Sequence, residues 1–198
     1  MKIANILKLL KGGIAIKVGI AGAHGTGKTT LLNRVKKEMP TLNIVTGVAR
    51  DCPFNINEDT TFKSQEWIFR EQVKRELAVP INEITISDRT VYDQLAYIAY
   101  AYNKGNITDD ELKLLEKYIS YWGFTYSYII YIPIEFEMEK DGVRSEDVEF
   151  RNEIDQLVQN MLEEYVCDER KCVIKGTEDE RYNQLKDLLL KLSIENVI

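Results

Sequence analysis

The sequence is poor in histidine, cysteine and proline, and each shortage excludes a class of function or structure. Its one histidine is His24, and its three cysteines are Cys52, Cys167 and Cys172. These residues form no CxxC pair, no metal-ligand spacing and no even set for disulfides, so we predict reduced thiols in a cytosolic protein. With only four prolines and no low-complexity tract, the chain shows no sign of extended disorder.

A basic excess and long apolar runs are also missing. The formal net charge of −6 argues against a protein that mainly grips nucleic acid or an anionic membrane, although a local basic pocket stays open. No run of about 18 apolar residues is present, so no membrane span is expected. Residues 1–12 predict an amphipathic N-terminal extension packed on the domain, with a membrane-surface helix as the alternative. The expected location is cytoplasmic.

The chain of 198 residues, 44% of them hydrophobic, predicts one domain over 1–198. Apolar runs typical of strands lie at 14–21, 43–46, 84–87, 126–132 and 172–175. Helical periodicity between them predicts helices over 29–39, from a cap at Thr60 or Thr61 to 77, over 91–102 and 108–121, after a cap at Ser145, and over 178–192. This alternation predicts a parallel sheet between two layers of helices, with the functional residues at the carboxyl ends of the strands.

A glycine-rich loop follows the first strand and matches the pattern G-x-x-x-x-G-K-[ST]. Glycine lets consecutive backbone N–H groups converge on phosphate at a helix N-terminus. Lys28 is expected to bind the β- and γ-phosphates of a nucleotide, and the Thr29 hydroxyl to bind Mg²⁺. His24 occupies a variable position, where a bystander role is favoured over a catalytic one. The predicted nucleotide-binding residues are Gly22, Ala23, His24, Gly25, Thr26, Gly27, Lys28, Thr29 and Thr30.

The third strand ends on Asp88-Arg89. A site of this type needs a carboxylate beside the phosphate loop, to hold the Mg²⁺ shell or to accept the acceptor's proton, and Asp88 is the best candidate. A helix-capping role for Asp88 is the alternative, and the two roles are compatible. Arg89 points to a transferase, because a guanidinium suits bidentate recognition of an anionic or polyhydroxyl acceptor.

The stretch Asp88-Arg89-Thr90, then Asp93, then Ala96-Tyr97 resembles the D-R-[ST]-x-x-D-x-x-A-Y pattern of small P-loop kinases with an AAA-type ATP-binding domain. These include ribosylnicotinamide-kinase-like proteins and, more distantly, thymidylate and deoxynucleoside kinases. The resemblance implies a three-layer α/β fold with strand order 2-3-1-4-5, ATP with GTP as the alternative, Mg²⁺, and a nucleoside-like acceptor bound by Arg89 and Asp93.

Residues 133–150 are similar to the lid of the same kinases, because Arg144 follows Asp141-Gly142 and Arg151 follows seven residues later. If the helix reaches back to Arg144, both guanidinium groups lie on nearly one side, where they would neutralise charge on the transferred phosphoryl group. The alternative is a solvated network of these arginines with the neighbouring acidic residues.

The second half of the pocket is expected around Arg50-Asp51, after the second strand. By resemblance Arg50 binds the acceptor and Asp51 positions its hydroxyl. Many family members have a glutamate three residues before that arginine, whereas this chain has Gly47. The sequence therefore leaves two candidates for the general base, Asp88 and Asp51.

Further candidates carry weaker signals. Gln65 and Phe69, with Gln72 and Phe62 on the same helix, would read a base edge and stack on its ring, although exposed glutamines beside core phenylalanines are the plainer account. Gly176 and Thr177 follow the last strand, and they are assigned to the adenine by fold analogy alone.

These residues predict ATP-dependent phosphoryl transfer to a nucleoside, nucleotide or ribosyl compound. A nucleotide-dependent switch is the first alternative, although Asn103-Lys104-Gly105-Asn106 lacks the acid of a guanine-selective NKxD motif. Action on a modified base or end of nucleic acid is the second, and the acidic charge counts against it. The acceptor and the oligomeric state, with a homodimer among the options, are not fixed by the sequence.

Overall fold

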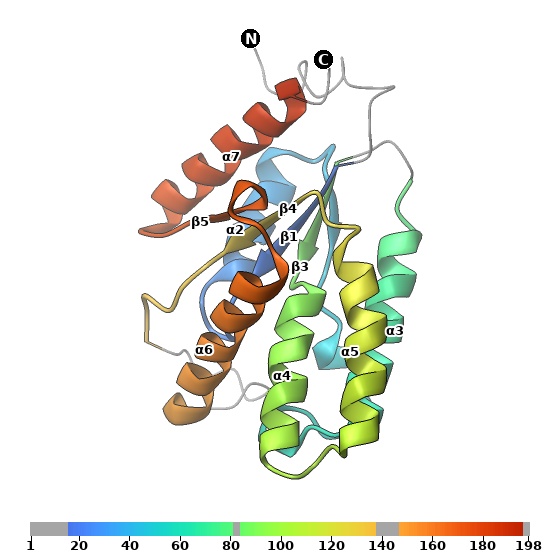
Figure 1. Ribbon diagram of the computed structural model, residues 1–198. Helices are drawn as coiled ribbons and strands as arrows, with labels where there is room; N and C mark the ends of the chain where they lie inside the picture. The colour runs from blue at the N-terminus through green and yellow to red at the C-terminus, as the bar shows by residue number, and fades with distance from the viewer. Residues whose placement is uncertain (1–15, 81–83, 138–146, 196–198) are drawn as a thin grey trace.

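The computed structural model describes residues 16–80, 84–137 and 147–195 of the chain. Strands and helices alternate along it, as the apolar runs predicted (Figure 1). The strands are β1 Lys17–Ala21, β2 Asn43–Val45, β3 Thr85–Asp88, β4 Tyr128–Tyr131 and β5 Lys171–Val173. The helices are α2 Lys28–Glu38, α3 Phe62–Leu77, α4 Val91–Asn103, α5 Asp109–Gly123, α6 Val148–Tyr165 and α7 Glu178–Glu195, with short 3-10 turns at Ala49–Asp51, Asn57–Asp59 and Asp168–Arg170.

The five strands form one parallel sheet in the order β2-β3-β1-β4-β5. This is the strand order that the kinase resemblance implied. Ile20 of β1 pairs in register with Asp88 of β3, so the end of β3 lies directly beside the start of the glycine-rich loop. The sheet therefore brings the two strongest motifs of the sequence to one edge.

Side chains from alternate positions of the strands build a core on each face of the sheet. Val18 and Ile20 of β1 pack with α2 and α7, whereas Ala21 faces the cluster formed mainly by α4, α5 and α6. Gly19 lets α4 pack closely on the sheet in the cluster of α4, α5 and α6, because a Cβ at this position would lie 2.5 Å from Thr90 Cγ2. The start of α4 can therefore press against the sheet close to the loop.

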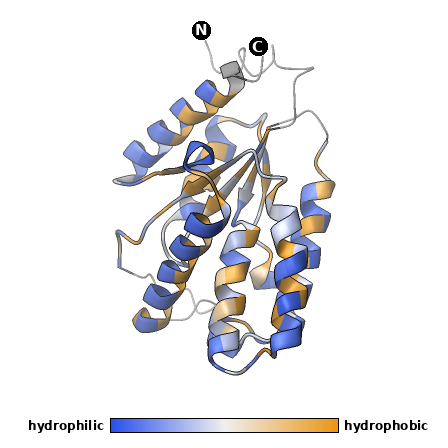
Figure 2. Cartoon of the chain, in the orientation of Figure 1, coloured by the Kyte–Doolittle hydropathy of each residue, from blue (hydrophilic) through white to orange (hydrophobic). Residues whose placement is uncertain are grey.

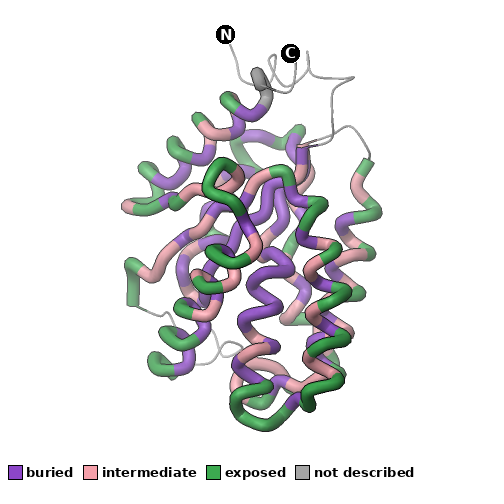
Figure 3. The backbone as a smooth tube through the Cα atoms, viewed as in Figure 1, coloured by how far each residue is buried: buried purple, intermediate pink, exposed green. Residues whose placement is uncertain are grey.

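Helix α4 is the most deeply buried helix beside the site. It packs between α5 and α6, and nine of its residues are buried. Much of α4 has the colours of apolar residues in Figure 2, and most of it is coloured as buried in Figure 3, whereas α3 and α5 also carry exposed residues. A helix held in this way gives Arg89, which precedes it, a rigid support.

Threonine caps begin four of the described helices, including α7 at Thr177. Thr61, Thr90 and Thr108 each accept a hydrogen bond from the backbone of the first turn, in capping boxes that stabilise a helix start by about 1 kcal/mol each. The prediction of Ser145 as the cap of the next helix was wrong, because Asp147 caps α6 and the helix begins at Val148. In the part of the chain that the structure describes, no helix is long and apolar enough to cross a membrane.

Candidate functional site

The glycine-rich loop joins the end of β1 to the start of α2. Gly22, Gly25 and Gly27 have φ values of 141°, 71° and 86°, a region that side-chain-bearing residues rarely adopt. Gly27 is the N-cap of α2, which has no side-chain cap and no acidic residue in its first turn. The first amides of this helix are therefore left for an anion, as a phosphate site requires.

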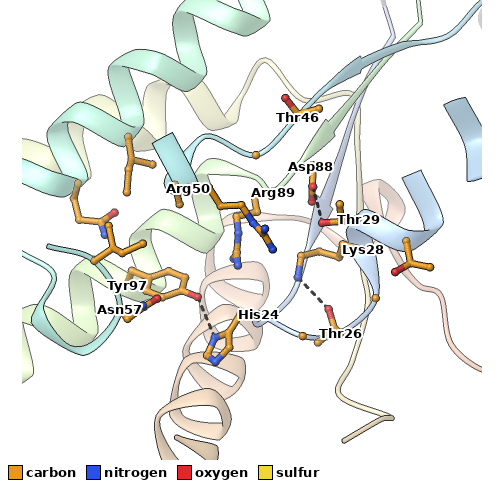
Figure 4. A pocket seen from close by; sticks show the side chains of 18 residues that line it. His24, Thr26, Lys28, Thr29, Thr46, Arg50, Asn57, Asp88, Arg89 and Tyr97 are labelled. Atoms are coloured by element: carbon orange, nitrogen blue, oxygen red, sulfur yellow. Dashed lines mark hydrogen bonds between the residues drawn. The ribbon is translucent and has the colours of Figure 1, made fainter. Parts of the chain in front are cut away.

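Lys28 lies over this loop and is only 5% exposed. Its ammonium donates to the carbonyl oxygens of Gly22 at 2.7 Å and Ala23 at 2.5 Å, and to the Thr26 hydroxyl at 3.0 Å. These acceptors hold the cation beside the helix N-terminus. Lys28 thus lines the cavity beside the start of α2, and its contact with phosphate stays a prediction (Figure 4).

Two buried arginines support the loop from behind. Arg151 of α6 donates to the carbonyl oxygens of His24 and Gly25, both at 3.1 Å, and to Phe136 at 3.0 Å. Arg181 of α7 donates to the Thr26 carbonyl at 2.5 Å and pairs with Glu135 at 2.7 Å. Burial lowers the pKa of Arg151, and Asp155 opposes this. The structure thus places Arg151 neither in a solvated surface network nor among the residues lining the cavity.

The carboxyl end of β3 supplies the acid of the site. Asp88 Oδ2 accepts a hydrogen bond of 3.0 Å from the Thr29 hydroxyl, so the two predicted Mg²⁺ ligands are adjacent. Gly47 lies beside them, since a Cβ built on it would be 3.7 Å from Asp88 Oδ2. The position at which the kinase resemblance leads us to expect a glutamate therefore borders the Asp88 carboxylate.

Arg89 directs its guanidinium into the cavity from an unusual backbone conformation, with φ of 85°. The guanidinium lies 3.6 Å from Asp93 Oδ1 and 5.5 Å from the centre of the Tyr97 ring. Burial opposes its charge, but Tyr97, Asp93 and Asp88 outweigh this and raise the pKa of Arg89 above its ordinary value. Arg89 therefore enters the site as a stable cation.

Asp93, predicted as an acceptor ligand, has a different position. Its carboxylate is fully buried and accepts hydrogen bonds from the Gly22 amide at 2.9 Å and the Thr90 amide at 2.8 Å. It thereby caps α4 and fixes the first residue of the glycine-rich loop. Asp93 does not line the cavity, and it reaches the site through the Gly22 amide and Arg89.

A cavity of about 340 Å³ runs from the glycine-rich loop to the start of α3 and the first turns of α4 (Figure 4). It brings together the predicted residues His24, Gly25, Thr26, Gly27, Lys28, Thr29, Thr30, Arg50, Gln65, Asp88 and Arg89. Sequence reasoning missed Thr46, Ala49, Ile56, Asn57, Ile68 and Tyr97 as lining residues. Of these, Tyr97 had a signal, because it closes the motif that begins at Asp88.

Several predicted residues lie away from the cavity. Asp51 pairs with Arg75 at 2.6 Å, and Phe69 lines a separate hollow between α3 and α5. The Gly176 amide donates to Glu135 at 2.7 Å, so Gly176 and Thr177 adjoin the support behind the loop. Gly22 and Ala23 form the loop without lining the cavity.

Gln65 and Gln72 are 3% and 4% exposed, so the account of exposed glutamines was wrong. Gln65 lines the cavity and donates to the Thr60 hydroxyl at 2.7 Å. His24 is also buried, with its ring centre 5.4 Å from that of Phe150. Arg144 and the N-terminal extension lie outside the described residues, and their roles stay predictions.

Comparisons with known proteins agree with this geometry. A family model described as an AAA domain matches residues 17–181. A search of curated proteins finds no match. Among solved structures, NadR protein in complex with NR has a TM-score of 0.72 at 22% identity, over 91% of this chain and 52% of NadR. The chain thus spans about half the length of NadR.

Deoxyadenosine kinase from M. mycoides, solved with the products dCMP and dCDP, has a TM-score of 0.67 at 18% identity, over 89% of this chain and 100% of the enzyme. NadR protein in complex with NAD and AMP-PNP has a TM-score of 0.70 at 19% identity. Likeness at these identities establishes the fold. It is the fold of the small P-loop kinases that the Asp88 to Tyr97 motif resembles.

Proposed function

This chain belongs to the AAA domain family, and we propose that it is a kinase. It transfers the γ-phosphoryl group of ATP to an oxygen of a nucleoside-like or nucleotide-like acceptor. One observation carries the proposal: a single cavity holds Lys28 and the Thr29–Asp88 pair at one end and continues to Arg50 and Arg89 at the other. A protein that only hydrolysed ATP would not need this second, basic end.

The residues at the phosphate end fit a nucleotide with Mg²⁺. Uncapped amides at the start of α2 and the Lys28 ammonium supply donors for the phosphates. The Thr29 hydroxyl and the Asp88 carboxylate supply the hard oxygen ligands that Mg²⁺ prefers. Bound there, Mg²⁺ would neutralise charge on the β- and γ-phosphates.

The residues at the acceptor end fit a polar ring that carries hydroxyl or phosphate groups. Arg50 and Arg89 provide positive charge, and Asp88 is the one carboxylate among the described residues lining the cavity. Gln65, Asn57 and Tyr97 offer hydrogen-bonding groups, while Ile56 and Ile68 offer apolar surface. This mixture suits the sugar and base of a nucleoside. It agrees with the NR and dCMP bound by the structural neighbours.

The transfer follows from this arrangement. The acceptor oxygen attacks the γ-phosphorus, the bond from that phosphorus to the ADP oxygen breaks, and the proton of an acceptor hydroxyl passes to the Asp88 carboxylate. Asp51 is the weaker candidate base, because it pairs with Arg75 and does not line the cavity. Positioning and charge neutralisation carry most of the catalysis in such reactions.

A labelled-phosphate transfer screen tests the proposal. The purified chain is given labelled ATP, Mg²⁺ and a panel of nucleosides, nucleotides, ribosides and oligonucleotides, with Lys28→Ala as the blank. We expect one class of small acceptor to be labelled, and Lys28→Ala to lower the rate about 1000-fold. Lys36→Ala is the matched control, because Lys36 is exposed on the same helix.

ATP turnover that depends on no acceptor in the panel would overturn the kinase proposal. Strong GTP selectivity, with a protein partner bound in one nucleotide state only, would favour a switch instead. Labelling of oligonucleotides with a steep salt dependence would redirect the proposal to nucleic acid.

A further inference from the structure

Arg89 is held in a backbone conformation that it would not adopt alone. Its φ of 85° lies in the left-handed region, which is unfavourable for a residue with a side chain. Such a conformation persists only where the surroundings fix it. Two hydrogen bonds to its main chain do so. The Arg89 amide donates to the Ile20 carbonyl at 3.1 Å, and the Arg89 carbonyl accepts from the side-chain Nε2 of Gln72 at 3.2 Å.

Gln72 lies on α3 and is 4% exposed. Its Oε1 accepts a hydrogen bond of 2.7 Å from Gln94 of α4, which fixes the orientation of the amide. Its Nε2 therefore faces three acceptors, the Arg89 carbonyl, the Tyr126 hydroxyl and the Glu76 carboxylate. A rotated amide would lose the contacts on both sides.

A buried carboxylate anchors this glutamine. The Glu76 side chain is 1% exposed and pairs with the Lys17 ammonium at 2.5 Å. It also accepts from the Trp122 indole at 2.6 Å, the Tyr126 hydroxyl at 2.8 Å and the Ser87 hydroxyl at 2.8 Å. The cluster thus joins β1, β3, α3 and the end of α5 beneath Arg89, and none of its members lines the cavity.

We propose that Gln72 is a positioning residue for the acceptor: its amide holds Arg89 in the left-handed conformation from which the guanidinium enters the cavity. The inference rests on the proposed function, in which Arg89 binds the acceptor. It separates the two ends of the cavity, because the Gln72 amide bonds to the Arg89 carbonyl, whereas the Lys28 ammonium bonds to Gly22, Ala23 and Thr26 of the glycine-rich loop. Loss of the Gln72 amide should therefore weaken acceptor binding and leave nucleotide binding unchanged.

The test compares Gln72→Met with Trp122→Phe. Methionine keeps the length of the side chain and removes both amide functions, so the Arg89 carbonyl loses its donor. We expect the acceptor KM to rise about tenfold while the ATP KM stays within about twofold. Trp122→Phe removes one hydrogen bond from Glu76 and leaves the Gln72 contact to Arg89, so it should lower stability without changing either KM.

A second variant and a second readout keep the test decisive if Gln72→Met folds poorly. Gln94→Met removes the donor that orients the Gln72 amide and should raise the acceptor KM about threefold. Hydrogen exchange of the Arg89 amide, followed by NMR against β1 amides, should be about tenfold faster in Gln72→Met. Unchanged acceptor KM and unchanged Arg89 exchange in both variants would overturn the inference.

These readouts separate the inference from the proposed function. If the wild-type chain transfers phosphate to no acceptor, the kinase proposal fails, while the Arg89 exchange rate still decides whether Gln72 holds this residue. If transfer occurs and Gln72→Met raises the acceptor KM and the ATP KM equally, the positioning role fails alone.

Discussion

The two ends of the cavity are built in different ways. The phosphate end is one contiguous loop and helix start, and Arg151 and Arg181 hold it by hydrogen bonds to its own carbonyl groups. The acceptor end collects single side chains from three separate stretches, represented by Arg50, Gln65 and Arg89. Hydrogen bonds to backbone carbonyl groups do not depend on the identity of the loop side chains. A pocket lined by side chains from several stretches, in contrast, can be matched to one ligand. We infer that the phosphate end carries the reaction and the acceptor end carries the specificity.

Asp88 pairs with Thr29 at the phosphate end and directly precedes Arg89 of the acceptor end, and its removal should have the largest effect among the four variants proposed below. We expect Asp88→Asn to lower the rate of phosphate transfer about 100-fold, because it removes an Mg²⁺ ligand and the proton acceptor. The initial rate with the acceptor found in the screen measures this. Asp51→Asn is the matched control and should change the rate less than about twofold, since Asp51 faces Arg75. A larger loss in Asp51→Asn would transfer the role of base to that residue.

Removal of Arg151 should weaken nucleotide binding at the phosphate end and lower the stability of the fold. Arg151→Met leaves three backbone carbonyl groups without their donor, so we expect the free energy of unfolding to fall by about 3 kcal/mol and the nucleotide Kd to rise about tenfold. Urea unfolding and titration with an ATP analogue measure the two effects. Asn152→Ala, exposed on the next position of α6, is the control.

The kinetic pattern also decides between two roles of Arg151. A rise in nucleotide Kd with nearly constant kcat supports the role of a loop support. A loss of kcat at unchanged nucleotide Kd would favour the predicted contact with the transferred phosphoryl group.

Acid should weaken the cluster beneath Arg89, because this cluster is built on the buried Glu76 carboxylate. Burial raises the pKa of Glu76, but Lys17 and the surrounding donors outweigh this, so the net pKa lies below its ordinary value. The stabilisation is therefore present above the pKa of the unfolded chain, about 4.3, and is lost as the pH falls through the folded pKa.

We expect Glu76→Gln to lower the free energy of unfolding by about 2 kcal/mol at pH 7 and to flatten its decline below about pH 4.3. Urea unfolding at several pH values measures both. Glu66→Gln, at a half-buried residue of the same helix that pairs with the exposed Arg70, should keep the wild-type slope. A wild-type slope in Glu76→Gln would contradict the assignment.

The same contrast explains what could be predicted from the sequence. Gly22 to Thr29 is contiguous, so its pattern predicted loop, helix start and ligand type together. The position of Asp88 followed from the end of an apolar strand. The contacts of Arg151 and Gln72 could not be predicted, because most of their partners lie far away in the chain: loop carbonyl groups for Arg151, and groups of α4 and its neighbours for Gln72. The resemblance predicts Asp93 as an acceptor ligand. The pair of Thr90 with Asp93 three residues later is also the signature of a capping box, and in the structure Asp93 completes that box.

The smallest expected effect tests how closely the acceptor end fits its ligand. A Cβ at Gly47 would lie 3.4 Å from the Asp88 carbonyl oxygen, an ordinary contact, and Gly47 has no positive φ. Gly47→Ala should therefore leave the free energy of unfolding within about 0.5 kcal/mol of the wild type. The added methyl group borders the Asp88 carboxylate, so we expect the acceptor KM to rise about twofold and the ATP KM to stay constant. An ATP KM that rose as much as the acceptor KM would mean that Gly47 belongs to the phosphate end.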